Sequence, residues 1–133
     1  MILQHLMSLA TLTLSHDLLW TDEHGWSPVV ANAEYSITGA LLIENAVRQA
    51  GRPISLSPPD PSMAWHTRAI VDMLLAWAGV PGQQFRLTID DGRSFTVVFR
   101  HHDAPAMEAK PVRGFPSFDA DDYWQVSLKL MEI

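Results

Sequence analysis

The segment from Asp60 to Arg100, DPSMAWHTRAIVDMLLAWAGVPGQQFRLTIDDGRSFTVVFR, decides the fold of this chain. It joins a helical pattern, a Gly-Val-Pro-Gly break and a strong β-hairpin. Asp60 is a good N-cap followed by a proline at the first helical position, with Ser62 or Thr67 as alternative starts. A glycine and a proline end the pattern, so we expect a helix over about residues 61–78. Its apolar stripe consists of Trp65, Ile70, Met73, Leu74 and Trp77.

The hairpin after the break has a register that the sequence determines. The apolar residues of its two strands are Phe85, Leu87 and Ile89, and Phe95, Val97 and Phe99. A two-residue loop would place these two sets on opposite faces, whereas a three-residue loop, Asp90-Asp91-Gly92, places both on one face. Because a one-residue slip turns every side chain over, we expect the three-residue loop with a left-handed glycine. The other face, which carries Arg86 and Arg100, is then polar and free.

Most of the remaining chain alternates like β-strands, in residues 9–14, 35–43, 54–56 and 124–130. Gly39 lies within the second of these and indicates a bulge, a bend or a close backbone approach. Residues 44–50 have helical propensity, but their context favours a strand, and a short strand is expected around 107–112. The sequence therefore predicts a mainly β (α+β) fold in a single domain over 1–133. The expected architecture is an antiparallel β-sandwich or partly open β-barrel with one flanking helix.

Composition narrows the classes of function. The chain has 133 residues, 47% of them hydrophobic, no cysteine and a formal net charge of −6. No lysine or arginine precedes Arg48, and the dispersed bases argue against nucleic-acid binding. The apolar start, MILQHLMSLATLTL, lacks the positive region of a signal peptide, so secretion is not expected. No apolar run has the length of a membrane span.

No residue cluster predicts a reaction. His101-His102-Asp103 resembles part of a metal site, but adjacent residues of a strand point to opposite faces, and a surface hairpin end is the preferred interpretation. The aspartates of residues 119–122 are typical of a solvated turn more than of an acid/base pair. The chain has no G-x-S-x-G elbow and no glycine-rich phosphate loop. We therefore expect a protein that is not an enzyme and that needs no cofactor and no metal.

The best candidates for binding are aromatic and cationic. Trp20 and Trp26 flank a polar loop and fit either a core or a subunit interface. Arg52 lies in a Gly-Arg-Pro corner, which is a plain turn or a rigid presentation of the arginine to an acidic neighbouring subunit. Together with Arg86 and Arg100, these residues form the predicted interface set. An alternative function is a small-molecule or carbohydrate binding module that uses exposed tryptophans.

Three segments, YSITGALLIENAVRQAGRPISL, FRLTIDDGRSFTVVFR and YWQVSLKLMEI, resemble small structural proteins from the tail-tip and baseplate region of long-tailed bacteriophages. The likeness covers about residues 35–132. Its motifs are the R-Q-A-G-R-P-I-S-L corner and the D-G-R-x-F-T-V-x-F-R hairpin.

The resemblance implies a structural virion protein that forms a ring of itself, of six copies, and links the tail tube to the baseplate hub. It implies a location in the virion tail after synthesis in the cytoplasm of the bacterial host. It also implies assembly without catalysis, so no catalytic residues are carried over. Residues 1–34 lie outside the likeness, and we expect them to form an arm or hairpin that reaches a neighbour.

Overall fold

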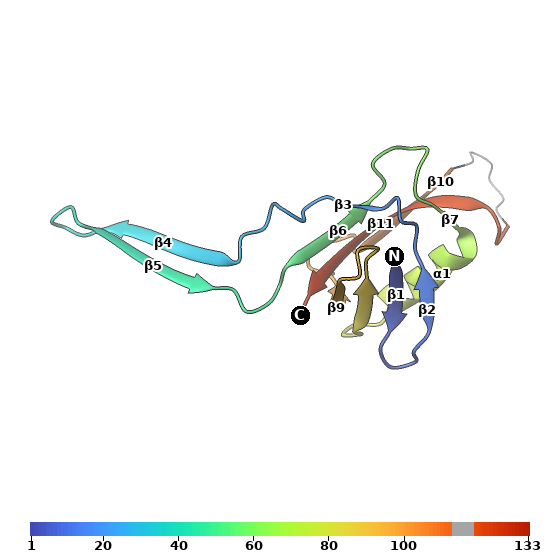
Figure 1. Cartoon of the computed structure of the whole chain (residues 1–133), viewed down its shortest axis with the longest axis horizontal. Helices are drawn as coiled ribbons and strands as arrows, with labels where there is room; N and C mark the ends of the chain where they lie inside the picture. Colours follow the sequence, from blue (N-terminus) through green and yellow to red (C-terminus); the bar gives the residue numbers. More distant parts are fainter. Residues whose placement is uncertain (113–118) are drawn as a thin grey trace.

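A computed structural model describes residues 1–112 and 119–133 and has two parts, a body and an arm (Figure 1). The body contains nine strands and one helix, and the arm is a two-stranded hairpin that projects from one end of it. The body strands are β1 (Ile2–His5), β2 (Thr11–Thr13), β3 (Leu19–Trp20), β6 (Pro53–Ser57), β7 (Trp65–Thr67), β8 (Phe85–Thr88), β9 (Ser94–Phe99), β10 (Met107–Pro111) and β11 (Tyr123–Glu132). The helix is α1 (Arg68–Ala78), and the arm consists of β4 (Val29–Tyr35) and β5 (Leu41–Val47).

The body is organised around β11, the longest strand. On one edge it pairs with β6 and β7, and on the other with β9 and β10, always antiparallel. The sheet continues through β8 and β1 to β2 at one side and ends at β3 on the other. The sheet does not close into a barrel. The predicted mainly β (α+β) class, with antiparallel strands and one helix, is confirmed.

The register of the β8–β9 hairpin is confirmed. Leu87 pairs with Phe95 and Phe85 pairs with Val97, as the three-residue loop requires. Gly92 has a φ of +94°, and its N–H donates to the carbonyl of Ile89. Both apolar sets therefore face the core, where Phe85, Leu87 and Val97 are fully buried. The inward set of β11, consisting of Val126, Leu128 and Leu130, is buried as expected.

The helix begins seven residues later than predicted. Asp60 does accept hydrogen bonds from the backbone and hydroxyl of Ser62, but this forms only a turn. Ala64 then adopts a positive φ of 59°, which no helix allows, and residues 65–67 pair with β11 as β7. Of the two alternative starts, Thr67 is the N-cap residue. The helix buries Val71, Leu74 and Trp77, so the predicted places of Trp65 and Met73 in the stripe were wrong.

The predicted strand through Gly39 is two strands and a turn. Residues 36–40 form the tip of the arm, where Ser36 N–H donates to the carbonyl of Ala40 and Gly39 has a φ of +87°. Five residues separate Tyr35 from Leu41. The odd-numbered residues of both strands therefore share one face of the arm, and the even-numbered residues share the other. The alternation of side chains therefore continues unbroken through the turn, and the sequence pattern predicted one long strand. Strand structure after Glu44 is confirmed as far as Val47.

Residues 1–34 are divided between the two parts. Strands β1 and β2 lie in the body sheet, where Leu3 is fully buried, and β3 forms its far edge. Only β4, from Val29, belongs to the arm, and its partner β5 lies beyond residue 34. The projecting element is thus built from residues 29–47.

Candidate functional site

Five side chains form an alternating arginine–tryptophan ladder where the arm leaves the body. The Arg52 guanidinium lies 4.7 Å from the ring centroid of Trp20 and 5.9 Å from that of Trp26. Arg93 lies against Trp20 at 5.6 Å, and Arg48 against Trp26 at 5.9 Å. Each such cation–π contact is worth about 0.5–1 kcal/mol when exposed and more when desolvated. Three of the predicted interface residues, Trp20, Trp26 and Arg52, therefore do lie together.

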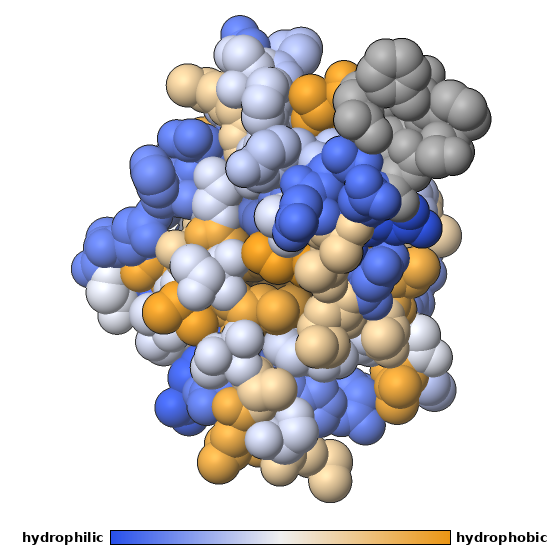
Figure 2. All heavy atoms as spheres, turned by 90° about the vertical axis from the view of Figure 1, so that its right-hand side faces the viewer, coloured by the Kyte–Doolittle hydropathy of each residue, from blue (hydrophilic) through white to orange (hydrophobic). Residues whose placement is uncertain are grey.

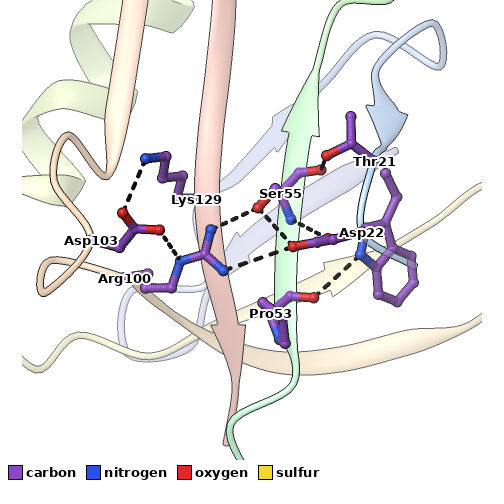
Figure 3. A network of polar contacts seen from close by, with 8 residues as sticks. Thr21, Asp22, Pro53, Ser55, Arg100, Asp103 and Lys129 are labelled. Atoms are coloured by element: carbon purple, nitrogen blue, oxygen red, sulfur yellow. Dashed lines mark hydrogen bonds and ion pairs between the residues drawn. The ribbon is translucent and has the colours of Figure 1, made fainter. Parts of the chain in front are cut away.

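Trp20 is held in place by a polar network between β3 and β6 (Figure 3). Its indole N–H donates to the carbonyl of Pro53 at 3.4 Å. The Asp22 carboxylate accepts from both the backbone N–H and the hydroxyl of Ser55, at 3.0 and 2.9 Å. Arg100 Nη2 donates to the same Ser55 hydroxyl at 2.7 Å. The hydroxyl is thereby committed both as donor and as acceptor, and the network anchors the edge of the sheet.

Arg100 belongs to this network and not to a free polar face. It is only 8% exposed, and its guanidinium also forms ion pairs with Asp22 at 3.9 Å and Asp103 at 3.4 Å. Lys129 adds a second cation to Asp103 at 3.4 Å (Figure 3). The prediction that Arg100 lies on a free face was wrong, because the chain turns back after β9. Arg86, in contrast, is exposed on β8.

Three ladder residues, Trp26, Arg48 and Arg52, line an open cavity of about 210 Å³ at the base of the arm. Its lining consists of Trp26, Arg48, Gln49, Ala50, Arg52, Glu132 and Ile133. The backbone of Gly51 and Arg52 is fixed to the end of β11 by two hydrogen bonds with Glu132. Arg52 Nη2 donates to the carbonyl of Glu23 at 3.0 Å, which orients the guanidinium across both rings. Arg52, in the Gly-Arg-Pro corner, thus contacts residues of its own chain and also lines the surface cavity.

The charges of the ladder are unevenly balanced. Arg93 forms ion pairs with Glu23 at 2.6 Å and Asp91 at 2.7 Å, and the hydrogen bond that it donates to Glu23 raises the pKa of Arg93 above the ordinary value. Within residues 1–112 and 119–133, neither Arg48 nor Arg52 has a carboxylate within ion-pair distance. The cavity therefore presents two cations that lie beside aromatic rings and form no ion pair among the described residues, and Glu132 also lines it.

The arm beside this cavity is exposed along its whole length. Every residue of β4 and β5 is exposed. The register places Tyr35 opposite Leu41 and Ala33 opposite Ile43 on one face, which is apolar except for Asn45. The other face places Asn32 opposite Glu44 and Glu34 opposite Leu42, so it is acidic. The large exposed apolar residues of the arm are Val29, Val30, Tyr35, Ile37, Leu41, Leu42, Ile43 and Val47.

A second concave surface lies at the helical end of the body, opposite the arm. Figure 2 views this end and shows apolar and polar residues intermixed over it. A groove of about 380 Å³ separates α1 from β10, and its lining includes Val71, Leu75, Met107 and Trp124. It holds no arrangement of polar groups beyond the Arg68–Asp72 pair and Glu108.

The histidines considered as metal ligands do not come together in the structure. His101 and His102 are exposed turn residues, and the described residues contain no group of three or more histidines or carboxylates that could hold a metal ion. His66 is the buried exception: it is 3% exposed, its Nε2 accepts the Ser15 N–H at 2.9 Å, and burial lowers its pKa. In the described part of the chain no helix is long and apolar enough to cross a membrane.

We compared the chain with known protein families, curated proteins and solved structures. No protein-family model, no curated protein and no solved structure matches the chain.

Sequence reasoning missed Arg48 and Arg93, and it expected the arm in residues 1–34, whereas the arm spans residues 29–47. Arg48 and Arg93 belong to no local motif, because the ladder joins three separate chain segments, residues 20–26, 48–52 and 93. The arm had one available signal: residues 29–47 contain no Lys, Arg or Pro, the residues that commonly protect strand edges.

Proposed function

We propose that this chain is a structural assembly subunit that acts by inserting its β4–β5 arm against another protein molecule. One observation carries the proposal: a two-stranded hairpin with apolar side chains on both faces projects from the body, and no element of the described residues covers it. An isolated hairpin of this kind is marginally stable at best in water. Its partner must therefore supply both the stability and the cover.

The residues of the arm favour contact with another protein chain over exposure to solvent. Ile37, Ile43 and Val47 are 107%, 56% and 67% exposed, and burial of each such side chain contributes roughly 1–2 kcal/mol. The outer edges of both strands have no strand partner in the described residues. Edges without lysine, proline or a bulge are the ones that pair with another chain. These features favour a permanent assembly contact.

The finer proposal is a ring-forming subunit of a bacteriophage tail tip or baseplate that links the tail tube to the hub. The sequence resemblance motivates the phage tail, the virion location, the six copies and the absence of catalysis. The arm extends beyond its own body, so a contact with the next copy joins two different surfaces (Figure 1). Contacts between different surfaces generate rings when the rotation closes.

The ladder argues against the rival function of a sugar-stacking module. Trp20 is 8% exposed, and Arg52, Arg93 and the edge of Phe95 pack against its ring. Trp26 has two guanidinium groups against it. A stacking platform needs a free ring face. Among the described residues, the groove beside Trp124 and the exposed ring of Trp65 are surfaces that a small apolar ligand could contact.

Native mass spectrometry and electron microscopy of the purified chain test the assembly proposal. We expect closed oligomers, and we expect a folded monomer when residues 29–47 are replaced by a short Gly-Ser loop. A wild-type chain that stays monomeric at high concentration, alone and with tube or hub proteins, would overturn the proposal.

A further inference from the structure

We propose that the cavity formed by Trp26, Arg48 and Arg52 receives the acidic face of the arm of a second copy, with Glu34 and Glu44 as its charged contacts. This inference rests on the proposed assembly function and identifies both sides of the contact. The second copy supplies the carboxylates that complete the site.

The cavity is built to bind a carboxylate. The Arg48 and Arg52 guanidinium groups both lie 5.9 Å from the ring centroid of Trp26, and planar guanidinium donors match the geometry of a carboxylate. Arg52 is further fixed by its hydrogen bond to the carbonyl of Glu23. Neither cation has a carboxylate partner among the residues that the structure describes. Glu132 and Ile133 also line the cavity.

The acidic face of the arm has the complementary character. Glu34 and Glu44 are the two charged residues of β4 and β5, and the register places both on one face. Diagonal neighbours across an antiparallel pair lie roughly 7–8 Å apart, so one partner surface can engage both. Glu34 accepts one weak hydrogen bond, from Asn32 at 3.5 Å, and no ion pair within residues 1–112 and 119–133 involves either glutamate.

The arm cannot fill its own cavity. A strand rises about 3.3 Å per residue, so Glu44 lies about 13 Å along the arm from Arg48, and Glu34 lies farther out. The arm is an extended hairpin that leads away from the body (Figure 1). The carboxylates must therefore come from another molecule.

A second copy is the occupant that the charges favour. Among the residues that the structure describes, two cations without an ion-pair partner lie at the base of the arm and two such anions lie along its acidic face. Copies joined arm to base would match both sets and would also cover part of the exposed apolar surface. An unrelated partner would leave one of the two sets unmatched in every copy.

Charge reversal in two separate variants tests the contact. One variant is Glu34→Lys with Glu44→Lys, and the other is Arg48→Glu; Lys110→Glu, exposed on β10, is the matched control. Circular dichroism confirms folding, and sedimentation velocity at low salt measures assembly. We expect each variant to raise the dissociation constant about tenfold or more, and the control to leave it unchanged. An equimolar mixture of the two variants should recover assembly in oligomers that alternate the two chains, because each contact between unlike chains again brings opposite charges together at position 48.

The outcomes separate the two proposals. If both variants assemble like wild type while the arm-replaced chain stays monomeric, this inference falls and the assembly function stands. If each variant fails and their mixture also fails, the arm and the cavity do not meet, and the inference falls. If wild type never assembles, both proposals fall.

Discussion

Strands β11 and β5 have similar alternating sequences and opposite surroundings. In β11 the alternate residues Val126, Leu128 and Leu130 are at most 1% exposed, covered by neighbouring strands and the core. In β5 the corresponding residues Leu41 and Ile43 are 50% and 56% exposed. One strand contributes its apolar face to the stability of the body, and the other keeps that face for a contact outside it. The comparison teaches that alternation predicts a strand but not what buries it.

The largest contrast is expected between two aromatic residues. Phe85→Ala should lower the free energy of unfolding by about 3–5 kcal/mol, because the ring is fully buried and packs against Trp77 and Phe99. Tyr35→Ala, at an arm residue that is 77% exposed, should change it by less than about 0.5 kcal/mol. Urea unfolding of both variants measures the difference. Equal losses would show that the arm belongs to the cooperative unit of the body.

A smaller difference in the free energy of unfolding is expected between variants of Arg100 and Arg86, which the sequence placed on one free face. Arg100→Gln should cost about 2 kcal/mol, since it removes a charged hydrogen bond to Ser55 and leaves Asp22 and Asp103 less compensated. Arg86→Gln, on the exposed side of β8, serves as the control and should lie within about 0.5 kcal/mol of wild type. Similar values for the two variants would contradict the structural role of the network.

The body should also have a pH dependence that originates at His66. Burial lowers the pKa of His66 below 6.5, so the folded state favours the neutral imidazole that accepts the Ser15 N–H. This contribution is fully present above the unfolded value of 6.5 and is lost as pH falls through the folded pKa. His66→Gln should cost about 1 kcal/mol at neutral pH and flatten the acid limb of the stability profile. His24→Gln, an exposed control, should leave that limb unchanged.

Removal of the arm should have the smallest effect on the stability of the monomer and the largest effect on assembly. Replacement of residues 29–47 by a short Gly-Ser loop should change the free energy of unfolding of the monomer by less than about 1 kcal/mol, because longer and shorter loops differ little in closure entropy. Thermal unfolding of dilute protein measures it. A collapse of the body in this variant would show that the arm stabilises the fold itself.

The sequence predicted the parts of the fold that local rules govern. The β8–β9 register followed from parity and a glycine turn, and the inward face of β11 followed from alternation. The helix start was misplaced because Asp60 and its proline form a capping turn that tertiary pairing of β7 with β11 then interrupts. The turn at Gly39 was hidden because a five-residue tip preserves parity.

The candidate site was predicted only in part. Trp20, Trp26 and Arg52 were selected as binding candidates from their residue types and their places in turns. Their union with Arg48 and Arg93 depends on how β3, β6 and the hairpin loop pack, which no local pattern encodes. Arg100 was assigned to the wrong surroundings for the same reason, since its partners Asp22 and Ser55 come from distant strands.

Hydrogen exchange at different protein concentrations tests the central claim most directly. In dilute monomer, the amides of residues 29–35 and 41–47 should exchange rapidly while those of β8, β9 and β11 stay protected. At concentrations where the chain assembles, the arm amides should gain protection and the body amides should change little. An arm that is as protected as the body in dilute monomer, or unprotected in the assembled state, would contradict the account.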